Sequence, residues 1–179
     1  MAVLLGIFAS TKNPELPTVK AVDLTKYAGQ WFEIAKLPNR FEKGLECITA
    51  TYTIKKNGKV EVRNGGIKIK NGKKQDIKGT AWVPNKNLPG VLKVRFFWPF
   101  AGDYYIMELD ENYQYALVGS PSRDYLWILS REPQLNEKIY AKLIDTAKEQ
   151  GFSYTNEYSF PAIFCRTPQI PFFPSLIMQ

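Results

Sequence analysis

The feature that most limits how this chain can fold is a series of short apolar runs, separated by turn signals, between Trp31 and Ser130. The runs are rich in β-branched and aromatic residues, which favour strands. Two of the turns contain an Asn-Gly pair, Asn57-Gly58 and Asn71-Gly72, and this pair suits a tight hairpin because both turn positions need positive φ. The pattern therefore predicts consecutive antiparallel strands joined by hairpins.

The series contains eight candidate strands and is followed by one candidate helix. Leu135, Ile139, Leu143 and Ala147 recur at steps of four residues with charges between them, which predicts an amphipathic helix from about Asn136 to Gln150. Eight hairpin-linked strands suffice to close a barrel, which removes exposed strand edges. We therefore expect an all-β fold: an eight-stranded antiparallel up-and-down barrel with one C-terminal amphipathic α-helix packed outside. The expected strands are 31–36, 47–54, 60–62, 77–83, 91–97, 104–109, 115–119 and 125–130.

The length of 179 residues fits one domain with one core. Residues 1–19 include an apolar run of the length found in secretory signals, too short to cross a bilayer, and we expect a signal-peptide remnant or an N-terminal arm there. Residues 20–165 are expected to form the barrel domain, and residues 166–179, which contain three prolines, an irregular C-terminal tail.

Residue types needed for common catalytic and metal sites are scarce. The chain has no histidine, the side chain used most often for acid–base catalysis and zinc binding. Its two cysteines, Cys47 and Cys165, form no CxxC motif. We therefore predict no catalytic residue, no metal site and no cofactor. The cysteines either form a long-range disulfide, which would add about 4–5 kcal/mol in the chain-entropy model and imply an oxidising compartment, or stay reduced in the core.

The charge balance favours anionic partners. Lys and Arg exceed Asp and Glu by 24 to 17, a net charge of +7, and such a surplus attracts phospholipid head groups or nucleic acids. A nucleic-acid-binding barrel would need exposed aromatic residues interleaved with Lys or Arg, whereas most aromatic residues here fall on the inward register, so we predict no nucleic-acid partner. The densest basic part is expected to be a solvated hairpin tip. It comprises Lys68, Lys70, Lys73, Lys74 and Lys78.

Two motifs at opposite ends of the strand series resemble signatures of the lipocalin family. Gly29-Gln30-Trp31, at the head of the first strand, is similar to the GxW motif. The segment from Tyr125 to Pro133 resembles the final-strand motif, in which an arginine, here Arg131, directly precedes the turn to the helix. The resemblance is to the bacterial lipocalin and apolipoprotein D-like branch, and covers roughly residues 23–152. At residues 110–113 the chain departs from the family's middle signature and keeps only an acidic turn.

The resemblance implies structural roles for a few residues. Gly29, Trp31 and Arg131 would form the structural signature, with Trp31 plugging the closed end of the barrel and Arg131 packed over its ring as a cation–π pair. Apolipoprotein D and related carriers also tie the second strand to the C-terminal segment by a disulfide, which supports joining Cys47 to Cys165.

The resemblance further implies binding or transport of a small hydrophobic or amphipathic ligand in the barrel cavity. A fatty acid, lysophospholipid or similar lipid is expected, in a role such as lipid storage or repair in the cell envelope. The alternative is a cysteine-dependent lipid isomerase of the same family; we expect no enzyme, because Cys47 has an expected disulfide partner. The chain is expected to be exported, as a periplasmic, outer-membrane-associated or secreted protein, and to act as a monomer or weak homodimer with transient membrane contact.

Strand alternation predicts which side chains face the cavity. Counting by twos from Trp31 and Arg131 places Glu33 and Ala35 inward on the first strand. The resulting wall is mostly apolar, with small residues that leave space for a ligand, although ordinary core packing is the alternative for each residue. The expected ligand-binding residues are Ala50, Tyr52, Val62, Gly79, Ala81, Val94, Phe96, Tyr105, Met107, Val118, Tyr125 and Trp127.

Two features near the expected open end concern polar and apolar contacts. A carboxylate or phosphate head group would lie close to basic residues there, and the candidates are Arg40, Lys43, Lys93 and Arg95. Residues 96–100, Phe-Phe-Trp-Pro-Phe, either rim the mouth as an apolar lip that touches membranes or a partner, or continue the fifth strand into a buried turn.

Overall fold

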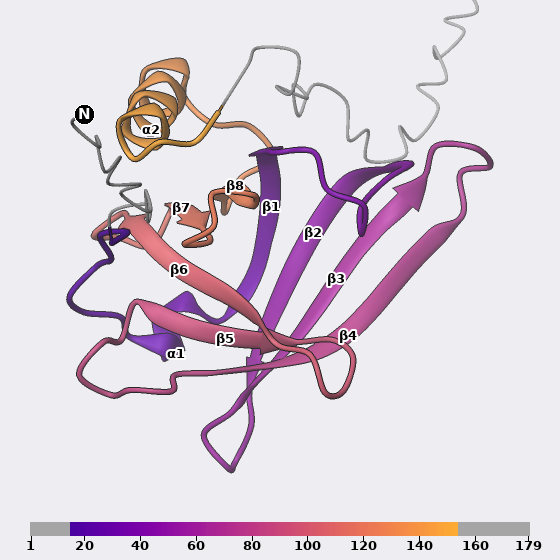
Figure 1. The fold of residues 1–179 in the computed structure, drawn as a ribbon. Coiled ribbons are helices and arrows are strands. Elements are labelled where there is room, and N and C mark those ends of the chain that lie inside the picture. Colours follow the sequence, from indigo (N-terminus) through magenta and orange to yellow (C-terminus); the bar gives the residue numbers. More distant parts are fainter. Residues whose placement is uncertain (1–14, 154–179) are drawn as a thin grey trace, which may run out of the picture.

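The computed structural model describes residues 15–153, which form one closed barrel with a helix outside it (Figure 1). Each strand pairs antiparallel with the next, and β8 closes the ring on β1. This confirms the expected fold class. The elements are α1 (Leu24–Tyr27), β1 (Gly29–Lys36), β2 (Leu45–Ile54), β3 (Val60–Lys68), β4 (Lys74–Trp82), β5 (Val91–Arg95), β6 (Gly102–Leu109), β7 (Tyr115–Gly119), β8 (Leu126–Ser130) and α2 (Glu137–Glu149).

Several expectations concern residues beyond this part of the chain. The expected C-terminal tail, Cys165 and most of the expected N-terminal arm lie outside the described residues. The pairing of Cys47 with Cys165 therefore stays a prediction. Within residues 15–153, no helix has both the length and the apolar character needed to cross a bilayer.

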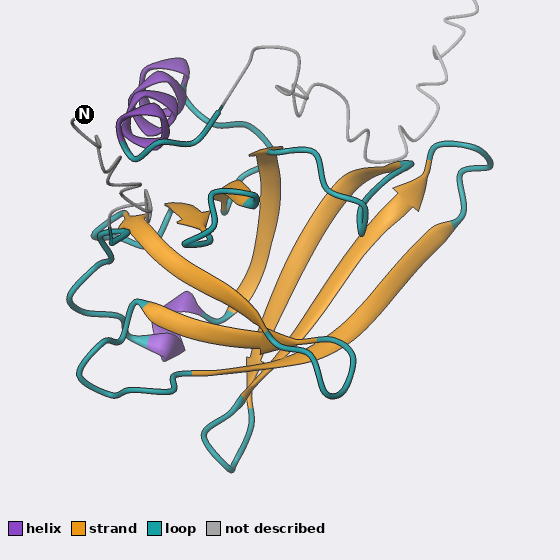
Figure 2. Ribbon diagram, viewed as in Figure 1, coloured by secondary structure: helices purple, strands orange, loops and turns teal. Residues whose placement is uncertain are grey.

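The hairpins form where the Asn-Gly pairs predicted them, and Figure 2 shows the turns that join the strands. Gly58 and Gly72 have φ values of +77° and +66°, a region that glycine enters without the steric cost of a Cβ. Asn57 and Asn71 do not have positive φ, so the expectation of positive φ at both turn positions is wrong. The lysines of the second tip are exposed, as expected. β3 and β4 are longer than the apolar pattern indicated, because their outer ends carry polar, solvent-facing residues that still pair.

Helix α2 packs on the outer wall of the barrel, as its periodicity predicted. Asn136 caps the first turn by accepting a hydrogen bond from the Lys138 backbone N–H (2.9 Å). Leu143, Ile144 and Ala147 form the buried face of the helix. They belong to an apolar cluster with residues of β1, β7 and β8, which we call the outer cluster. A second apolar cluster, the interior cluster, fills the inside of the barrel. These strands are therefore covered on both faces.

A β-bulge in β1 changes which side chains point inward. The register between β1 and β8 shifts between Glu33 and Ala35: Glu33 lies opposite Leu129 of the interior cluster, whereas Ala35 lies opposite Ile128 of the outer cluster. The expected inward position of Ala35 is therefore wrong. Lys36 lies opposite Trp127 and takes the inward position instead, because an extra residue in one strand reverses the faces beyond it.

Candidate functional site

The closed end of the barrel is built around Trp31, which is completely buried. Its indole Nε1 donates to the Tyr27 carbonyl (2.8 Å), and the Arg131 guanidinium lies 3.8 Å from the ring centroid. This geometry matches the predicted cation–π pair. Gly29 has a φ of +96°, and a Cβ there would lie 3.3 Å from the Arg131 Nη1, so both backbone and space favour glycine.

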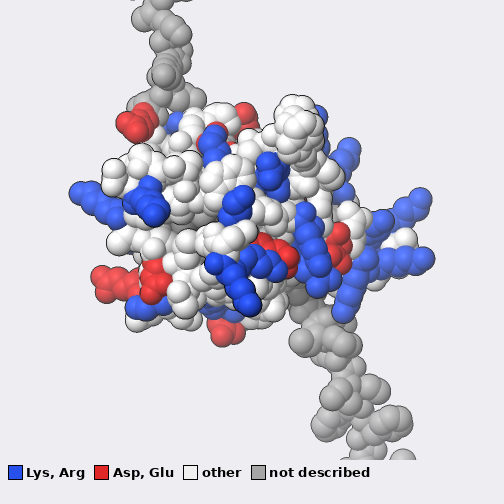
Figure 3. All heavy atoms as spheres, turned by 90° about the horizontal axis from the view of Figure 1, so that it is seen from below, with Lys and Arg blue, Asp and Glu red and all other residues white. Residues whose placement is uncertain are grey.

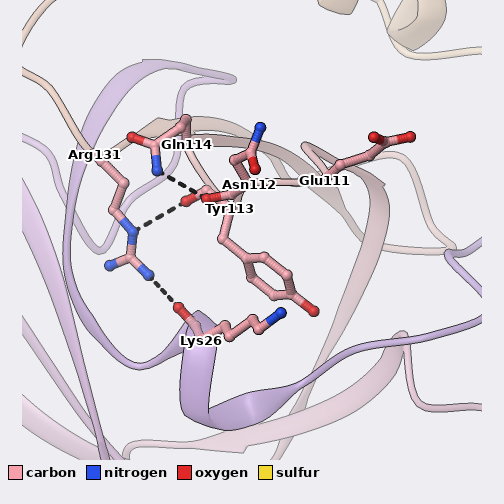
Figure 4. A pocket seen from close by; sticks show the side chains of 6 residues that line it. All are labelled: Lys26, Glu111, Asn112, Tyr113, Gln114 and Arg131. Carbon is pink, nitrogen blue, oxygen red and sulfur yellow. Dashed lines mark hydrogen bonds between the residues drawn. The ribbon is translucent and has the colours of Figure 1, made fainter.

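An open hollow of about 390 Å³ adjoins Arg131 at this end (Figure 4). Arg131 donates to the carbonyls of Gln30, Lys26 and Tyr113, at 2.7, 2.8 and 3.2 Å, and its Nη2 also contacts those of residues 27 and 28. Because Nε, Nη1 and Nη2 all bind backbone carbonyls, the guanidinium is occupied in tying α1 and the β6–β7 turn to β8. The hollow is therefore part of the structural closure. Its lining is Lys26, Glu111, Asn112, Tyr113, Gln114 and Arg131.

Three tyrosine hydroxyls form a buried chain inside the barrel. The Tyr104 hydroxyl is hydrogen-bonded to those of Tyr27 (2.7 Å) and Tyr52 (2.9 Å). Burial raises the pKa of Tyr52 to about 12 and also raises the pKa of Tyr27 and Tyr104, so all three phenols are neutral at physiological pH. The sequence predicts that Tyr52 points inward. It does not predict that Tyr104, or Tyr27 outside the strands, belongs to this hydrogen-bonded chain.

Most of the predicted wall residues lie in the interior cluster or pack against it: Ala50, Tyr52, Val62, Ala81, Val94, Phe96, Val118 and Trp127. Gly79 lies opposite Val62 on the inward register, and a Cβ there would lie 2.7 Å from the Phe96 ring. Tyr125 stacks on Trp127, with ring centroids 5.9 Å apart and planes at 7°. Ligand contact by this set stays a prediction.

For β6 the expected register is wrong. Tyr105 and Met107 belong to the outer cluster beneath α2, whereas Tyr104 and Ile106 face the interior. Residues 104–107 are all apolar or aromatic because the helix covers the outer face of this wall. The hydrophobic alternation that reveals a strand's register is then lost.

The interior also holds a buried charged cluster, of which the sequence predicted only the inward position of Glu33. Lys36 Nζ lies 2.9 Å from a Glu33 carboxylate oxygen and 2.8 Å from one of Glu42, with side chains only 9–10% exposed. Burial, reinforced by Glu42 and opposed by Lys36, raises the pKa of Glu33 to about 8. The Asn39 amide donates to Glu42 (2.7 Å), which ties the β1–β2 loop to the cluster. We call Glu33, Lys36 and Glu42 the buried charge triad.

An aromatic strip lies beside this triad. Trp127 is the β8 partner of Lys36, Tyr125 stacks on Trp127, and the Phe41 ring lies 6.1 Å from that of Tyr125. Phe41 is on the β1–β2 loop and is 63% exposed.

In an up-and-down barrel, alternate loops lie at the same end. The β1–β2, β3–β4, β5–β6 and β7–β8 loops therefore form one mouth, at the opposite end from α1 (Figure 1).

Two of the four basic residues that were expected to anchor a head group near the open end point away from the barrel interior. Lys93 pairs with Asp103 (2.7 Å), and Arg95 lies over the Trp82 ring, 5.7 Å from its centroid. β4 and β5 pair Trp82 with Lys93 and Thr80 with Arg95, and these positions alternate with the interior Ala81 and Val94. Lys93 and Arg95 thus point outward, a correction of the prediction, while Arg40 and Lys43 are exposed on the β1–β2 loop.

The loop between β5 and β6 forms an exposed apolar lip at the mouth. Phe97, Trp98 and Phe100 are 64%, 82% and 78% exposed, so the buried-turn alternative is wrong, while Phe96 packs against the interior.

Figure 3, which views the molecule from below, shows Lys and Arg side chains outnumbering acidic ones, with Asp and Glu among them rather than in a separate zone.

Comparisons with known proteins agree with this geometry. The family model described as "Lipocalin-like domain" matches residues 22–162. Outer membrane lipoprotein Blc of Vibrio cholerae is 42% identical over 135 residues, which cover 75% of this chain and 79% of that protein. Apolipoprotein D of Bos taurus is 39% identical over 162 residues, covering 81% and 84%. The solved structure of insecticyanin from the tobacco hornworm Manduca sexta superposes with a TM-score of 0.62 at 21% identity, covering 82% and 88%.

Proposed function

The chain belongs to the lipocalin family, and from this premise we propose that it binds a small hydrophobic or amphipathic molecule inside its barrel. A fatty acid, a lysophospholipid or a similar lipid is the ligand class. The observation that carries the proposal is a closed barrel whose inner wall combines small apolar residues, such as Ala50 and Ala81, with the aromatic strip at the mouth. Such a wall suits an acyl chain, and the aromatic rings suit its more polar end.

Extraction of the purified protein tests this proposal. Native mass spectrometry should show a fraction of protein with bound mass, and organic extraction should release a fatty acyl species. Added lipid should also change tryptophan emission, because Trp127 lies on the inner wall and is only partly buried. A protein that is reproducibly empty, and whose tryptophan emission no added lipid alters, would count against ligand binding.

We further propose a place for this activity in the cell. The Blc relatives are named outer membrane lipoproteins, which supports export to the cell envelope, as a periplasmic, outer-membrane-associated or secreted protein. Lipid storage or repair in the envelope is the role that fits such a carrier. We propose a monomer or weak homodimer.

The alternative function, a cysteine-dependent lipid isomerase, would need an accessible thiolate. Cys47 lies in β2 with a φ of +53°, where the register with β3 shifts, and Cys165 is its proposed disulfide partner. Thiol titration of the unfolded, unreduced protein separates the two functions. We expect no reactive thiol; two reactive thiols would support the enzyme.

The apolar lip supports transient contact with lipid surfaces. Exposed aromatic side chains partition into the interfacial region of a bilayer, and the lysines of the β3–β4 hairpin lie at the same end of the barrel. We predict that the double variant Trp98→Ser, Phe100→Ser co-sediments at least about threefold less with vesicles containing phosphatidylglycerol. The control is Leu88→Ser, which removes an exposed apolar residue at the opposite end. If co-sedimentation with vesicles falls equally in both variants, the lip is not a specific membrane contact.

A further inference from the structure

Several polar groups inside the barrel are not explained by closure of the fold. They are the buried charge triad, the aromatic strip next to it, and, elsewhere in the interior, the side-chain amide oxygen of Asn64 on β3. Resting on the proposed function, we propose that the triad and the aromatic strip form a head-group subsite near the mouth that selects amphiphiles carrying an ammonium group over free fatty acids. The acyl chain would occupy the apolar wall below it.

When Glu33 is ionised, at a pH above its raised pKa of about 8, the triad contains more negative than positive charge. Glu33 and Glu42 share the single cation of Lys36, at 2.9 and 2.8 Å. All three side chains are about nine-tenths buried, so water compensates the second carboxylate only weakly. The raised pKa of Glu33 reflects the same imbalance, because burial and the Glu42 charge both disfavour its ionised form. A ligand cation would supply the missing positive charge.

The neighbouring aromatic strip suits the same ligand group. The faces of aromatic rings attract ammonium and quaternary ammonium groups, and pockets that bind such groups combine ring faces with carboxylates. Tyr125 and Trp127 are stacked and partly buried, and Trp127 is the strand partner of Lys36. Ring faces and carboxylates therefore occur together on adjacent strands of the inner wall.

A second, independent observation comes from β3. Asn64 lies opposite Ala50 of the interior cluster, and its Oδ1 is buried without a hydrogen-bond partner among the described residues. A buried acceptor without a donor costs about 1–3 kcal/mol. A ligand N–H or O–H in the barrel would satisfy this oxygen, whereas a carboxylate head group carries no donor. Asn64 pairs across the sheet with Ala50, which in turn pairs with Trp31, so this acceptor lies apart from the triad and adds a second donor-seeking oxygen to the barrel interior.

The proposal predicts a preference opposite to the one expected from overall charge. The whole chain has a net charge of +7, so non-specific attraction favours anionic amphiphiles. A carboxylate entering the triad could pair with Lys36, but with Glu33 ionised it would leave three negative groups around one cation. Tighter binding of a cationic amphiphile would therefore report the local subsite rather than the surface.

Isothermal titration calorimetry with decylamine, decanoate and decanol tests the proposal on the full chain. These probes share one alkyl chain and differ only in the head group. At pH 8.5, above the raised pKa of Glu33, we expect decylamine to bind at least about tenfold more tightly than decanoate. Glu33→Gln should lower that ratio at least about fivefold and leave decanol affinity within about twofold.

The matched control is Glu61→Gln, the same chemical change at a partly exposed carboxylate that pairs with Lys55 on the outer face. It should leave the ratio unchanged. Glu42→Gln provides a second interior variant, and circular dichroism checks that every variant is folded. If all three probes bind but decanoate is preferred, the subsite is refuted while ligand binding stands. The same conclusion follows if the ratio of decylamine to decanoate affinity is equal in Glu33→Gln and Glu61→Gln. If none of the probes binds, the proposed function itself fails.

Discussion

Trp31→Ala is expected to lower the free energy of unfolding by about 3–5 kcal/mol, the range for removing a fully buried large aromatic side chain. Trp31 has no exposed surface, and its indole N–H binds the Tyr27 carbonyl. The change would remove one of two donors to that carbonyl, which also accepts from Arg131 Nη2 (3.1 Å), and would remove the ring on which the Arg131 guanidinium packs. Urea unfolding followed by far-ultraviolet circular dichroism measures the effect.

Trp98→Ala is the matched control for this prediction. Trp98 is 82% exposed on the β5–β6 loop, so the same substitution should change stability by no more than about 0.5 kcal/mol. Unfolding midpoints of the two variants that agree within error would show that Trp31 does not hold the closed end together.

Glu33→Gln is expected to change how stability depends on pH. The pKa of Glu33 is raised from 4.5 to about 8 in the folded protein, so the folded state holds the proton more tightly than the unfolded state. The resulting stabilisation is complete below the unfolded pKa and is lost as the pH rises through the folded pKa. Glutamine cannot ionise, and the variant should therefore gain about 2–4 kcal/mol relative to the wild type between pH 4 and pH 9.

Urea unfolding at pH 4, 6.5 and 9 would show this as two stability profiles that diverge with rising pH. Glu61→Gln is again the control. Its pKa is lowered, first by the hydrogen bond from Lys55, so the wild-type carboxylate stabilises the fold at high pH and the variant should change in the opposite direction. If the stability profiles of the wild type and Glu33→Gln are parallel, the Glu33 carboxylate is not destabilised by burial and by too little positive charge around it.

Strand number, order and the outer helix could be predicted because local chemistry encodes them. Gly58 and Gly72 supply the positive φ that each hairpin turn needs, and the spacing of Leu143 and Ala147 matches one helical face. The contact of Trp31 with Arg131 could also be predicted, but only through resemblance to a family, because no local pattern brings the first and last strands together.

Inward and outward faces could be predicted only where one face meets water. On β2 and β3, partly or fully exposed polar residues alternate with Ala50, Tyr52 and Val62, and the predicted register is confirmed there. On β6 both faces are apolar because α2 covers the outside, so Tyr105 and Met107 were assigned to the wrong side.

By itself, the sequence determined that eight hairpin-linked strands close into a barrel with a helix outside, because turn chemistry and hydrophobic periodicity act between near neighbours in the chain. Only the tertiary structure decided which charged residues join Glu33 inside it. The bulge in β1 turns Lys36 inward, and the β1–β2 loop brings Glu42 to the same point. A one-residue shift in pairing reverses every side chain beyond it, and that shift depends on how β1 and β8 meet, which local sequence does not encode.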